Sequence, residues 1–257
     1  MFFNPNHLKV SILTVSYQSA ATLRQTIESV LAQDFPSIEY WVIDGGSTDG
    51  SLEILQSFAD RIHFISEPDR GIYDAMNKGL GRLTGDIIGM IGADDFYPSH
   101  DVISSVVQAF TQHDVDVVYG DKQYVNPGDP HTIVRYWKAG AYQMSNWLYG
   151  WMPPHLSFYI RKSAADKNGP YLTQFTCSAD YEWMLRALYK HKMSAMYLPK
   201  VLMTMRNGGT STASWKHRWV ANREDRMAWA ANDLKPFWFT LTLKPLRKIS
   251  QLFKKNL

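Results

Sequence analysis

Apolar residues alternate between two spacings over the first 120 residues of the chain. Short runs rich in valine and isoleucine are typical of strands buried on both faces, and they predict strands at 9–15, 38–43, 62–66, 86–91 and 116–119. Between them, apolar residues three or four positions apart predict helices at about 23–31, 52–58, 72–83 and 103–112. This alternation predicts an α/β fold with a mainly parallel, Rossmann-like sheet flanked by helices.

The pattern is weaker after residue 120. Strands are predicted at 132–137, 157–160 and 201–206, a helix at 179–190 and a long helix at 213–232. No internal repeat or low-complexity linker interrupts the chain. We therefore expect one folded unit at 1–212, followed by a helical C-terminal segment at 213–257.

Acidic residues directly follow three of the predicted strands. Asp44 follows the second strand, Glu67 and Asp69 follow the third, and Asp94 and Asp95 follow the fourth. In a parallel sheet these strand ends face one crevice. Two adjacent carboxylates repel each other, and a divalent cation such as Mg²⁺ or Mn²⁺ would offset their charge. The alternative is that Asp94 and Asp95 start a turn or cap the next helix.

Composition narrows the functional classes. The formal net charge of +3 over 257 residues is too small for the whole molecule to be a nucleic-acid-binding protein. Cys177 is the single cysteine, which excludes an intramolecular disulfide and fits a reducing compartment. The sequence shows neither a signal peptide nor a run of about 18 apolar residues, so we expect a cytoplasmic protein without a membrane-spanning helix.

The loop at 45–50 contains three glycines but matches neither familiar nucleotide-binding motif. It lacks the GxGxxG spacing of the dinucleotide fingerprint, and no lysine stands where a P-loop needs one. A bound nucleotide would therefore have to be held differently.

Three segments carry a more specific resemblance. They read VSILTVSYQSAATLRQTIESVLAQDFPSIEYWVIDGGSTDGS, EPDRGIYDAMNKGLGRLTGDIIGMIGADD and CSADYEWMLRAL. They resemble, in order, the family 2 glycosyltransferases of the GT-A fold, and the match runs from about residue 10 to residue 209. GIYDAMNKG, with the later PPH and NGGTS, is similar to bacterial enzymes that assemble capsule, exopolysaccharide or lipopolysaccharide repeat units.

The resemblance implies an inverting, metal-dependent transfer of a sugar from a nucleoside-diphosphate sugar to a saccharide acceptor, which in such pathways is lipid-linked. It divides the unit at 1–212 into a nucleotide-sugar half at about 8–120 and an acceptor half at about 121–212. Thr14, Ser16 and Asp44 would line the pocket for the base and ribose. Asp69 and Asn77 would lie near the nucleotide and the donor sugar.

The remaining roles concern the metal and the acceptor. Asp94 and Asp95 would form the family's acidic motif, which touches the ribose or the sugar and holds Mn²⁺ or Mg²⁺. Asp180 would be the general base, although Asp at this place is also typical of a helix N-cap. Glu182 is a weaker candidate for the acceptor side. His155 follows two prolines in the segment that should border the acceptor, and its alternative is a packed histidine.

The chain departs from the family pattern at two positions. Gly45 stands where many relatives have a second acidic residue that contacts the base. Gly92 stands where many have an Asp, which leaves open whether Asp94 or Asp95 is the main metal ligand. The turn that follows Arg206 resembles a loop that closes over the diphosphate, or it is an ordinary turn.

The end of the chain is basic and amphipathic. Aromatic residues at 237–239 precede a stretch from 244 onward that has no acidic residue. This composition predicts a helix lying on the inner face of the cell membrane, and the alternative is a helix packed on the catalytic unit. The basic positions are Lys244, Arg247, Lys248, Lys254 and Lys255, and the apolar ones are Leu246, Ile249, Leu252 and Phe253.

Two other functions stay open at this level. A nucleotidyltransferase shares an α/β nucleotide fold and an acidic metal site, but it normally has a basic glycine-rich loop near its N-terminus, and residues 13–19 contain no basic residue. A non-catalytic nucleotide-sugar-binding protein would not need the acidic residues at 44, 94, 95 and 180.

Overall fold

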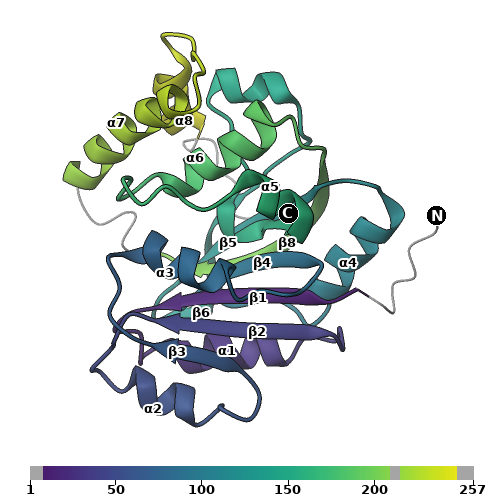
Figure 1. Cartoon of the computed structure of the whole chain (residues 1–257), viewed down its shortest axis with the longest axis vertical. Helices are drawn as coiled ribbons and strands as arrows, with labels where there is room; N and C mark the ends of the chain where they lie inside the picture. Colours follow the sequence, from purple (N-terminus) through teal and green to yellow (C-terminus); the bar gives the residue numbers. More distant parts are fainter. Residues whose placement is uncertain (1–7, 209–214, 248–257) are drawn as a thin grey trace.

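A single mixed sheet organises the chain (Figure 1). The computed structural model describes residues 8–208 and 215–247, and within them eight strands pair in this sheet. The strands are β1 (Val10–Ser16), β2 (Ile38–Asp44), β3 (His63–Ser66), β4 (Ile87–Gly92), β5 (Val117–Asn126), β6 (Asp129–Trp137), β7 (Phe158–Arg161) and β8 (Ala195–Arg206).

Helices cover both faces of the sheet. Adjacent strand residues such as Ile12 and Leu13 belong to two different buried clusters, one on each face. One cluster contains residues of α1 and α4, and the other contains residues of α3, α6 and α7. The helices are α1 (Leu23–Leu31), α2 (Ser51–Gln56), α3 (Ile72–Leu80), α4 (Val102–Gln112), α5 (Lys162–Asn168), α6 (Ala179–Leu185), α7 (Trp215–Ala231) and α8 (Thr240–Arg247), with the 3₁₀ turns η2 (Met144–Tyr149) and η3 (His155–Ser157) and the π turn η4 (Arg186–Lys190).

The first four predicted strands are confirmed as a parallel set in the order β3-β2-β1-β4. Their carboxyl ends are aligned, because Ser16 pairs with Asp44, Asp44 with Ser66, and Val15 with Gly92. The loops that leave these strands therefore meet at one edge of the sheet, as the sequence predicts.

The second half of the sheet differs from the predicted parallel pattern. β7 lies between β4 and β5 and is antiparallel to both. β5 is longer than predicted and forms an antiparallel pair with β6, while β8 runs parallel to β5. The pairing of β8 with β5 skips Pro199 and Lys200 at a register shift, and this bulge explains why only the part of β8 after residue 200 gives a strand pattern in the sequence.

A close approach between α3 and β1 fixes the loop that enters α3. A Cβ atom at Gly79 would lie 2.3 Å from the Cδ1 atom of Leu13, so only glycine allows the helix to pack at this distance. The segment 67–71, directly before α3, is thereby held at the carboxyl edge of the sheet.

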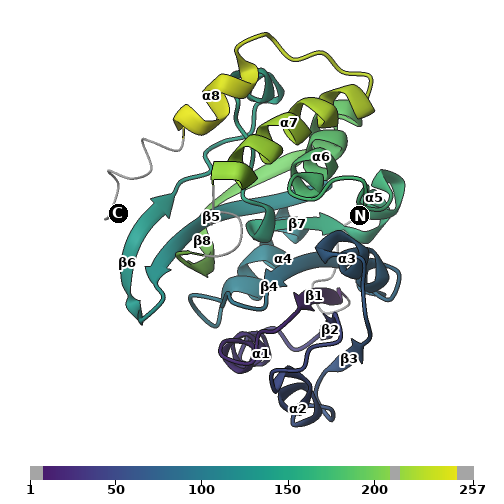
Figure 2. The ribbon, with the colours of Figure 1, turned by 90° about the vertical axis from the view of Figure 1, so that its left-hand side faces the viewer.

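The C-terminal helices pack on the rest of the described chain. Figures 1 and 2 show α7 beside α6, at the opposite end of the molecule from α2. The Lys244 ammonium forms an ion pair of 2.7 Å with Asp225 and lies 3.6 Å from the ring centroid of Tyr181. The prediction that Lys244 faces a membrane is therefore wrong, because its charge is neutralised inside the protein.

The basic and apolar positions from 248 to 257 lie outside the described residues. Within 8–208 and 215–247, no helix has the length and apolar character needed to cross a bilayer.

Candidate active site

The Asp95 carboxylate is the most unusual group at the carboxyl edge of the sheet. Asp95 is 1% exposed, and neither of its side-chain oxygens has a hydrogen-bond partner among the described residues. Burial and the adjacent Asp94 carboxylate raise its pKa to about 8, although the positive charges of Lys122 and Arg206 act in the opposite direction. A buried carboxylate without a partner is costly, so this position fits a bound cation.

Gly92 provides the space for these carboxylates. A Cβ atom at residue 92 would lie 2.7 Å from the Asp95 Oδ2 atom and 3.1 Å from the Asp94 Oδ1 atom. The glycine that departs from the family pattern thus leaves room for the two carboxylates in the orientation that they have here.

A metal ion at this pair would need ligands from a bound molecule. The described residues contain no group of three or more His, Cys, Asp or Glu side chains that could hold a metal ion. Asp94 and Asp95 supply hard oxygen atoms, which suit Mg²⁺ or Mn²⁺, and such sites commonly share the ion with substrate phosphates.

Arg206, at the end of β8, fixes the segment that carries Asp94. Its guanidinium donates hydrogen bonds to the Asp94 carbonyl oxygen and to the Gln25 side chain, and it lies 5.3 Å from the centroid of the Phe96 ring. The turn predicted to close over the diphosphate continues into residues 209–214, which lie outside the described residues.

Asp44 organises the loop that follows β2. Its buried carboxylate accepts hydrogen bonds from the backbone amides of Gly46 and Ser47 and from the hydroxyls of Ser47 and Ser66, at 2.6–3.1 Å. The side chain therefore shapes the loop at 45–47. Its predicted contact with the base stays a prediction.

The two polar side chains predicted on β1 differ in their environments. Thr14 is completely buried, and its hydroxyl lies 2.9 Å from the Tyr40 hydroxyl. The Ser16 hydroxyl is buried without a hydrogen-bond partner, at the end of the strand. Ser16 is thus better placed than Thr14 to bind a ligand at this edge.

Asp69 occupies the space beside Gly45. A Cβ atom at residue 45 would lie 2.5 Å from the Asp69 Oδ2 atom, and the other oxygen accepts a 2.8 Å hydrogen bond from the Gly71 amide. The Asp69 carboxylate therefore occupies the space beside position 45, where many relatives carry an acidic group and this chain has glycine.

Asn77 is engaged with the protein backbone. Its side-chain amide donates to the Tyr171 carbonyl oxygen at 2.9 Å and accepts from the Tyr171 amide at 2.8 Å. Asn77 therefore joins α3 to the segment before α6. The family resemblance places Asn77 near the donor and does not predict this structural role.

Asp180 lies in the first turn of α6, where Ser178 is the N-cap residue. The helix-cap interpretation of Asp180 is therefore wrong. The carboxylate accepts hydrogen bonds from the Tyr181 amide at 2.8 Å and from the Tyr73 hydroxyl at 3.4 Å. Burial and the charge of Asp180 hold the pKa of Tyr73 well above its ordinary value, so this hydroxyl stays protonated and donates to Asp180.

His155 connects this region to β4 through Tyr171. Its Nε2 atom lies 2.9 Å from the Tyr171 hydroxyl, which lies 3.4 Å from the Met90 sulfur. Burial lowers the pKa of His155, although the charge of Asp180 opposes this effect. Because the Tyr73 and Tyr171 rings are stacked, Asp180 and His155 belong to one polar and aromatic cluster beside β4.

Glu182 does not face this cluster. Its carboxylate is completely buried, forms an ion pair of 2.9 Å with Arg186 and accepts a 2.9 Å hydrogen bond from Asn232. The prediction that Glu182 lies on the acceptor side is therefore wrong, because its two oxygens join α6 to η4 and to the end of α7.

Glu224 supports the Asp180 segment and was missed in the sequence. Its carboxylate, on α7, accepts hydrogen bonds of 2.8–2.9 Å from the backbone amides of Thr176, Cys177 and Ser178, and one of 2.7 Å from the Thr176 hydroxyl. We call these contacts the Glu224 clamp. A glutamate in an otherwise ordinary helical segment gave no signal, since its partners are backbone groups 46–48 residues away.

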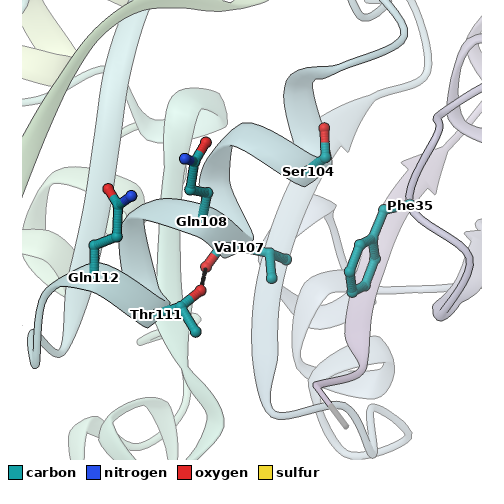
Figure 3. Close-up of a pocket in the computed structure, with 6 residues that line it drawn as sticks. All are labelled: Phe35, Ser104, Val107, Gln108, Thr111 and Gln112. Atoms are coloured by element: carbon teal, nitrogen blue, oxygen red, sulfur yellow. Dashed lines mark hydrogen bonds between the residues drawn. The ribbon is translucent and has the colours of Figure 1, made fainter. Parts of the chain in front are cut away.

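One surface hollow lies away from these groups. It is formed by Phe35 and the outer side of α4, and its lining is drawn in Figure 3. None of the six side chains that line it is charged, so this hollow offers no group for acid–base or metal chemistry. The candidate site is therefore the carboxyl edge of the sheet.

The chain is similar to known proteins in sequence and in fold. The chain is 28% identical over 204 residues to a PGL/p-HBAD biosynthesis glycosyltransferase of Mycobacterium bovis, covering 77% of each chain. Its fold is similar to that of S. aureus TarS 1-349 in complex with UDP-GlcNAc, with a TM-score of 0.70, 18% identity and coverage of 95% of this chain and 73% of TarS 1-349. The chain spans 41% of a longer TarS chain.

A second solved structure shares the fold. The mannosyltransferase PcManGT from Pyrobaculum calidifontis, in complex with GDP-Man and Mn²⁺, gives a TM-score of 0.65 at 17% identity, and the alignment covers 99% of this chain and 78% of PcManGT. The family model described as Glycosyl transferase family 2 matches residues 11–191. The chain therefore belongs to glycosyl transferase family 2 and is a glycosyltransferase with the GT-A fold.

Proposed function

We propose that the protein transfers a sugar, with inversion, from a nucleoside-diphosphate sugar to a saccharide acceptor in the synthesis of a bacterial surface polysaccharide. The acceptor that we propose is lipid-linked. The observation that carries the proposal is the Asp95 carboxylate, which is buried without a partner at the carboxyl end of β4 and calls for a cation.

In this proposal Asp180 is the general base. It takes the proton of an acceptor hydroxyl while that oxygen attacks the anomeric carbon on the face opposite the diphosphate. Tyr73 holds the carboxylate through its hydroxyl. Asp94 and Asp95 hold Mn²⁺ or Mg²⁺, which would offset the negative charge that develops on the departing diphosphate.

Known proteins of this fold support a nucleoside-diphosphate sugar as the donor, but they do not indicate which nucleobase it carries. TarS has been solved with UDP-GlcNAc and PcManGT with GDP-Man and Mn²⁺, so proteins of this fold bind donors with different bases. Membership of family 2 favours sugar transfer over nucleotidyl transfer. Membership of this family, together with glycosyltransferase relatives, also favours an enzyme over a binding protein.

Ligand-dependent thermal unfolding tests the proposal. UDP, GDP and dTDP, alone and as sugar conjugates, would each be added with Mn²⁺ and with EDTA. We expect nucleotides with one of the three bases to raise the melting temperature. A ligand at about 100 times its Kd should add about 2.7 kcal/mol to the free energy of unfolding, and we expect EDTA to reduce this stabilisation. Stabilisation by nucleoside triphosphates alone, or by no nucleotide, would contradict the proposal.

We also propose peripheral contact with the inner face of the cell membrane. The support comes from exposed aromatic and apolar side chains next to the basic end of the chain: Tyr149 is 47% exposed, Trp238 86% and Leu246 54%. Arg247 donates a hydrogen bond to the Tyr149 carbonyl oxygen, so the chain passes this patch as it enters residues 248–257, which contain three lysines and no acidic residue. Aromatic side chains beside basic ones are typical of proteins that lie on anionic lipid.

Co-sedimentation with vesicles measures this contact. We expect the protein to bind vesicles that contain phosphatidylglycerol and to bind phosphatidylcholine vesicles much less, because the basic residues need anionic lipid. Replacing Trp238 by serine should lower binding to the anionic vesicles by roughly tenfold. Equal binding to both vesicle types would refute an electrostatic contact, and unchanged binding of Trp238→Ser would remove the aromatic patch from it.

A further inference from the structure

Lys122, on β5, is a buried cation without a matching anion. Lys122 is only 7% exposed, and its ammonium nitrogen donates a hydrogen bond of 3.0 Å to the Met205 sulfur. The same nitrogen lies 5.0 Å from the Tyr124 ring centroid and 4.7 Å from that of Trp137. None of the ion pairs formed among residues 8–208 and 215–247 includes Lys122.

These contacts do not replace an anion. A thioether sulfur is a weak hydrogen-bond acceptor, and an aromatic face stabilises a cation by only about 0.5–2 kcal/mol. Lysine is almost never buried unless it is paired, since removing an ammonium from water costs several kcal/mol. The environment of Lys122 is therefore incomplete in the same sense as that of Asp95.

A second basic residue lies on the same patch of the sheet. The Arg135 guanidinium lies 4.7 Å from the Tyr124 ring centroid and 6.0 Å from that of Trp137. The pairing of β5 with β6 places Lys122 opposite Trp137 and Tyr124 opposite Arg135. Two basic side chains and two aromatic rings thus alternate on one patch of the sheet.

Lys122 acts on both sides of the candidate site. Its charge lowers the pKa of Asp95, on the donor side, and also lowers the pKa of His155, on the acceptor side. The ammonium lies next to the donor side, because it contacts Met205, and the neighbouring Arg206 donates a hydrogen bond to the Asp94 carbonyl oxygen. The space between the donor carboxylates and the Asp180 cluster is where the transferred sugar and its phosphates have to lie.

We propose that the Lys122 ammonium binds the diphosphate of the donor and stays bound to it as the leaving group. This inference rests on the proposed function. During transfer, the bond between the anomeric carbon and the diphosphate oxygen breaks, and its electron pair stays on that oxygen. The acceptor oxygen forms the new bond to the anomeric carbon, and the acceptor proton goes to Asp180. Lys122 stabilises the resulting nucleoside diphosphate by its fixed positive charge.

The chemistry of the site favours a diphosphate as the missing anion. The ammonium is a compact donor of three hydrogen bonds, which suits phosphate oxygens. The Arg206 guanidinium contacts the Asp94 carbonyl oxygen, and Lys122 contacts Met205, the neighbour of Arg206, so both contribute positive charge close to the place proposed for the metal. Lys122 would then share the diphosphate with the metal ion, and part of the diphosphate affinity should persist without metal.

Calorimetric titration of Lys122→Met tests the inference. Methionine keeps the length and the apolar stem of lysine, so it fits against Met205 and the two rings. The titrants are the nucleoside diphosphate that binds the wild type, the corresponding monophosphate and the free nucleoside, each with Mn²⁺ and with EDTA. We expect the affinity for the diphosphate to fall by about ten- to a hundredfold in both conditions, with unchanged affinity for the nucleoside.

Lys200→Met is the matched control, because it removes one positive charge from β8, where Lys200 pairs with Asp101 at the surface. We expect it to bind the diphosphate like the wild type. Lys122→Gln provides a second variant if the methionine protein does not fold. Equal diphosphate binding by the wild type and a folded Lys122 variant overturns the inference, as does an equal loss for the diphosphate and the nucleoside. Failure of the wild type to bind any nucleoside diphosphate overturns the proposed function itself.

Discussion

Replacing Asp180 by asparagine should lower sugar transfer by about 10²–10⁴-fold, because asparagine cannot accept the acceptor proton. The substitution preserves the size of the side chain, and its oxygen can still accept hydrogen bonds from the Tyr73 hydroxyl and the Tyr181 amide. The measurement is the rate of nucleoside diphosphate release in the presence of acceptor, together with the Kd for the donor. We expect that Kd to stay within about twofold of the wild-type value.

Asp166→Asn is a suitable control for this variant. Asp166 is an acidic residue on the neighbouring helix α5, its side chain is 61% exposed, and its partner is Lys162 at the surface. This control should transfer sugar at the wild-type rate. Retained transfer by Asp180→Asn would show that another group removes the proton, and a parallel loss of donor binding would place Asp180 on the donor instead of the acceptor.

Replacing Asp95 by asparagine should stabilise the metal-free protein and abolish its response to metal. The change removes a buried negative charge that no described residue neutralises by a hydrogen bond. Its pKa is raised from 3.8 to about 8 in the folded protein, and each unit corresponds to about 1.4 kcal/mol. The full penalty is on the order of 5 kcal/mol, and relaxation of the site reduces it, so we expect a gain of about 2–4 kcal/mol in EDTA.

The pH dependence of this gain has a definite direction. A carboxyl group whose folded pKa is raised contributes most to stability below its unfolded pKa, and the contribution is lost as the pH rises through the folded value. The stability difference between Asp95→Asn and the wild type should therefore be small near pH 4 and grow until about pH 8.

Urea unfolding across this range, with EDTA and with Mn²⁺, measures the effect. Mn²⁺ should stabilise the wild type and leave Asp95→Asn unchanged. A variant that is no more stable than the wild type at alkaline pH in EDTA would mean that Asp95 finds a partner in solution.

The parallel half of the fold could be predicted because it depends on local patterns. The strands β1, β2 and β4 are short, mostly buried runs rich in apolar residues, and the helices between the strands carry apolar residues at the spacing of one buried helix face. Aligned carboxyl ends then follow from right-handed crossover connections. This is why Asp44, Asp69 and Asp95 could be placed at one edge before any geometry was known.

The antiparallel half could not be predicted in the same way. The insertion of β7 between β4 and β5 is a contact between distant segments, and it leaves no mark in either one. β8 contains Pro199, which breaks the strand pattern although the bulge accommodates it.

The positions of the candidate site residues could be predicted after strands but not on helices. Those that follow a strand were placed correctly at the edge, whereas residues on helices depend on which way the helix faces. Glu182 and Asn77 have chemically suitable side chains, but they are engaged by Arg186 and by the Tyr171 backbone. The partners of a side chain on α6 are decided by α7 and η4, and the sequence of α6 alone does not contain that information.

The Glu224 clamp also sets an order of events during protein synthesis. Domains form from the N-terminus onward as the chain emerges, and the strands β1 to β4, with the acidic residues that follow them, emerge well before α7. The amides of Thr176, Cys177 and Ser178 receive their acceptor only when α7 has emerged, about 40 residues after Asp180. In the proposed function, a chain released before α7 would therefore carry the residues proposed to bind the donor and would lack the hydrogen-bond acceptor that holds the segment of its proposed base.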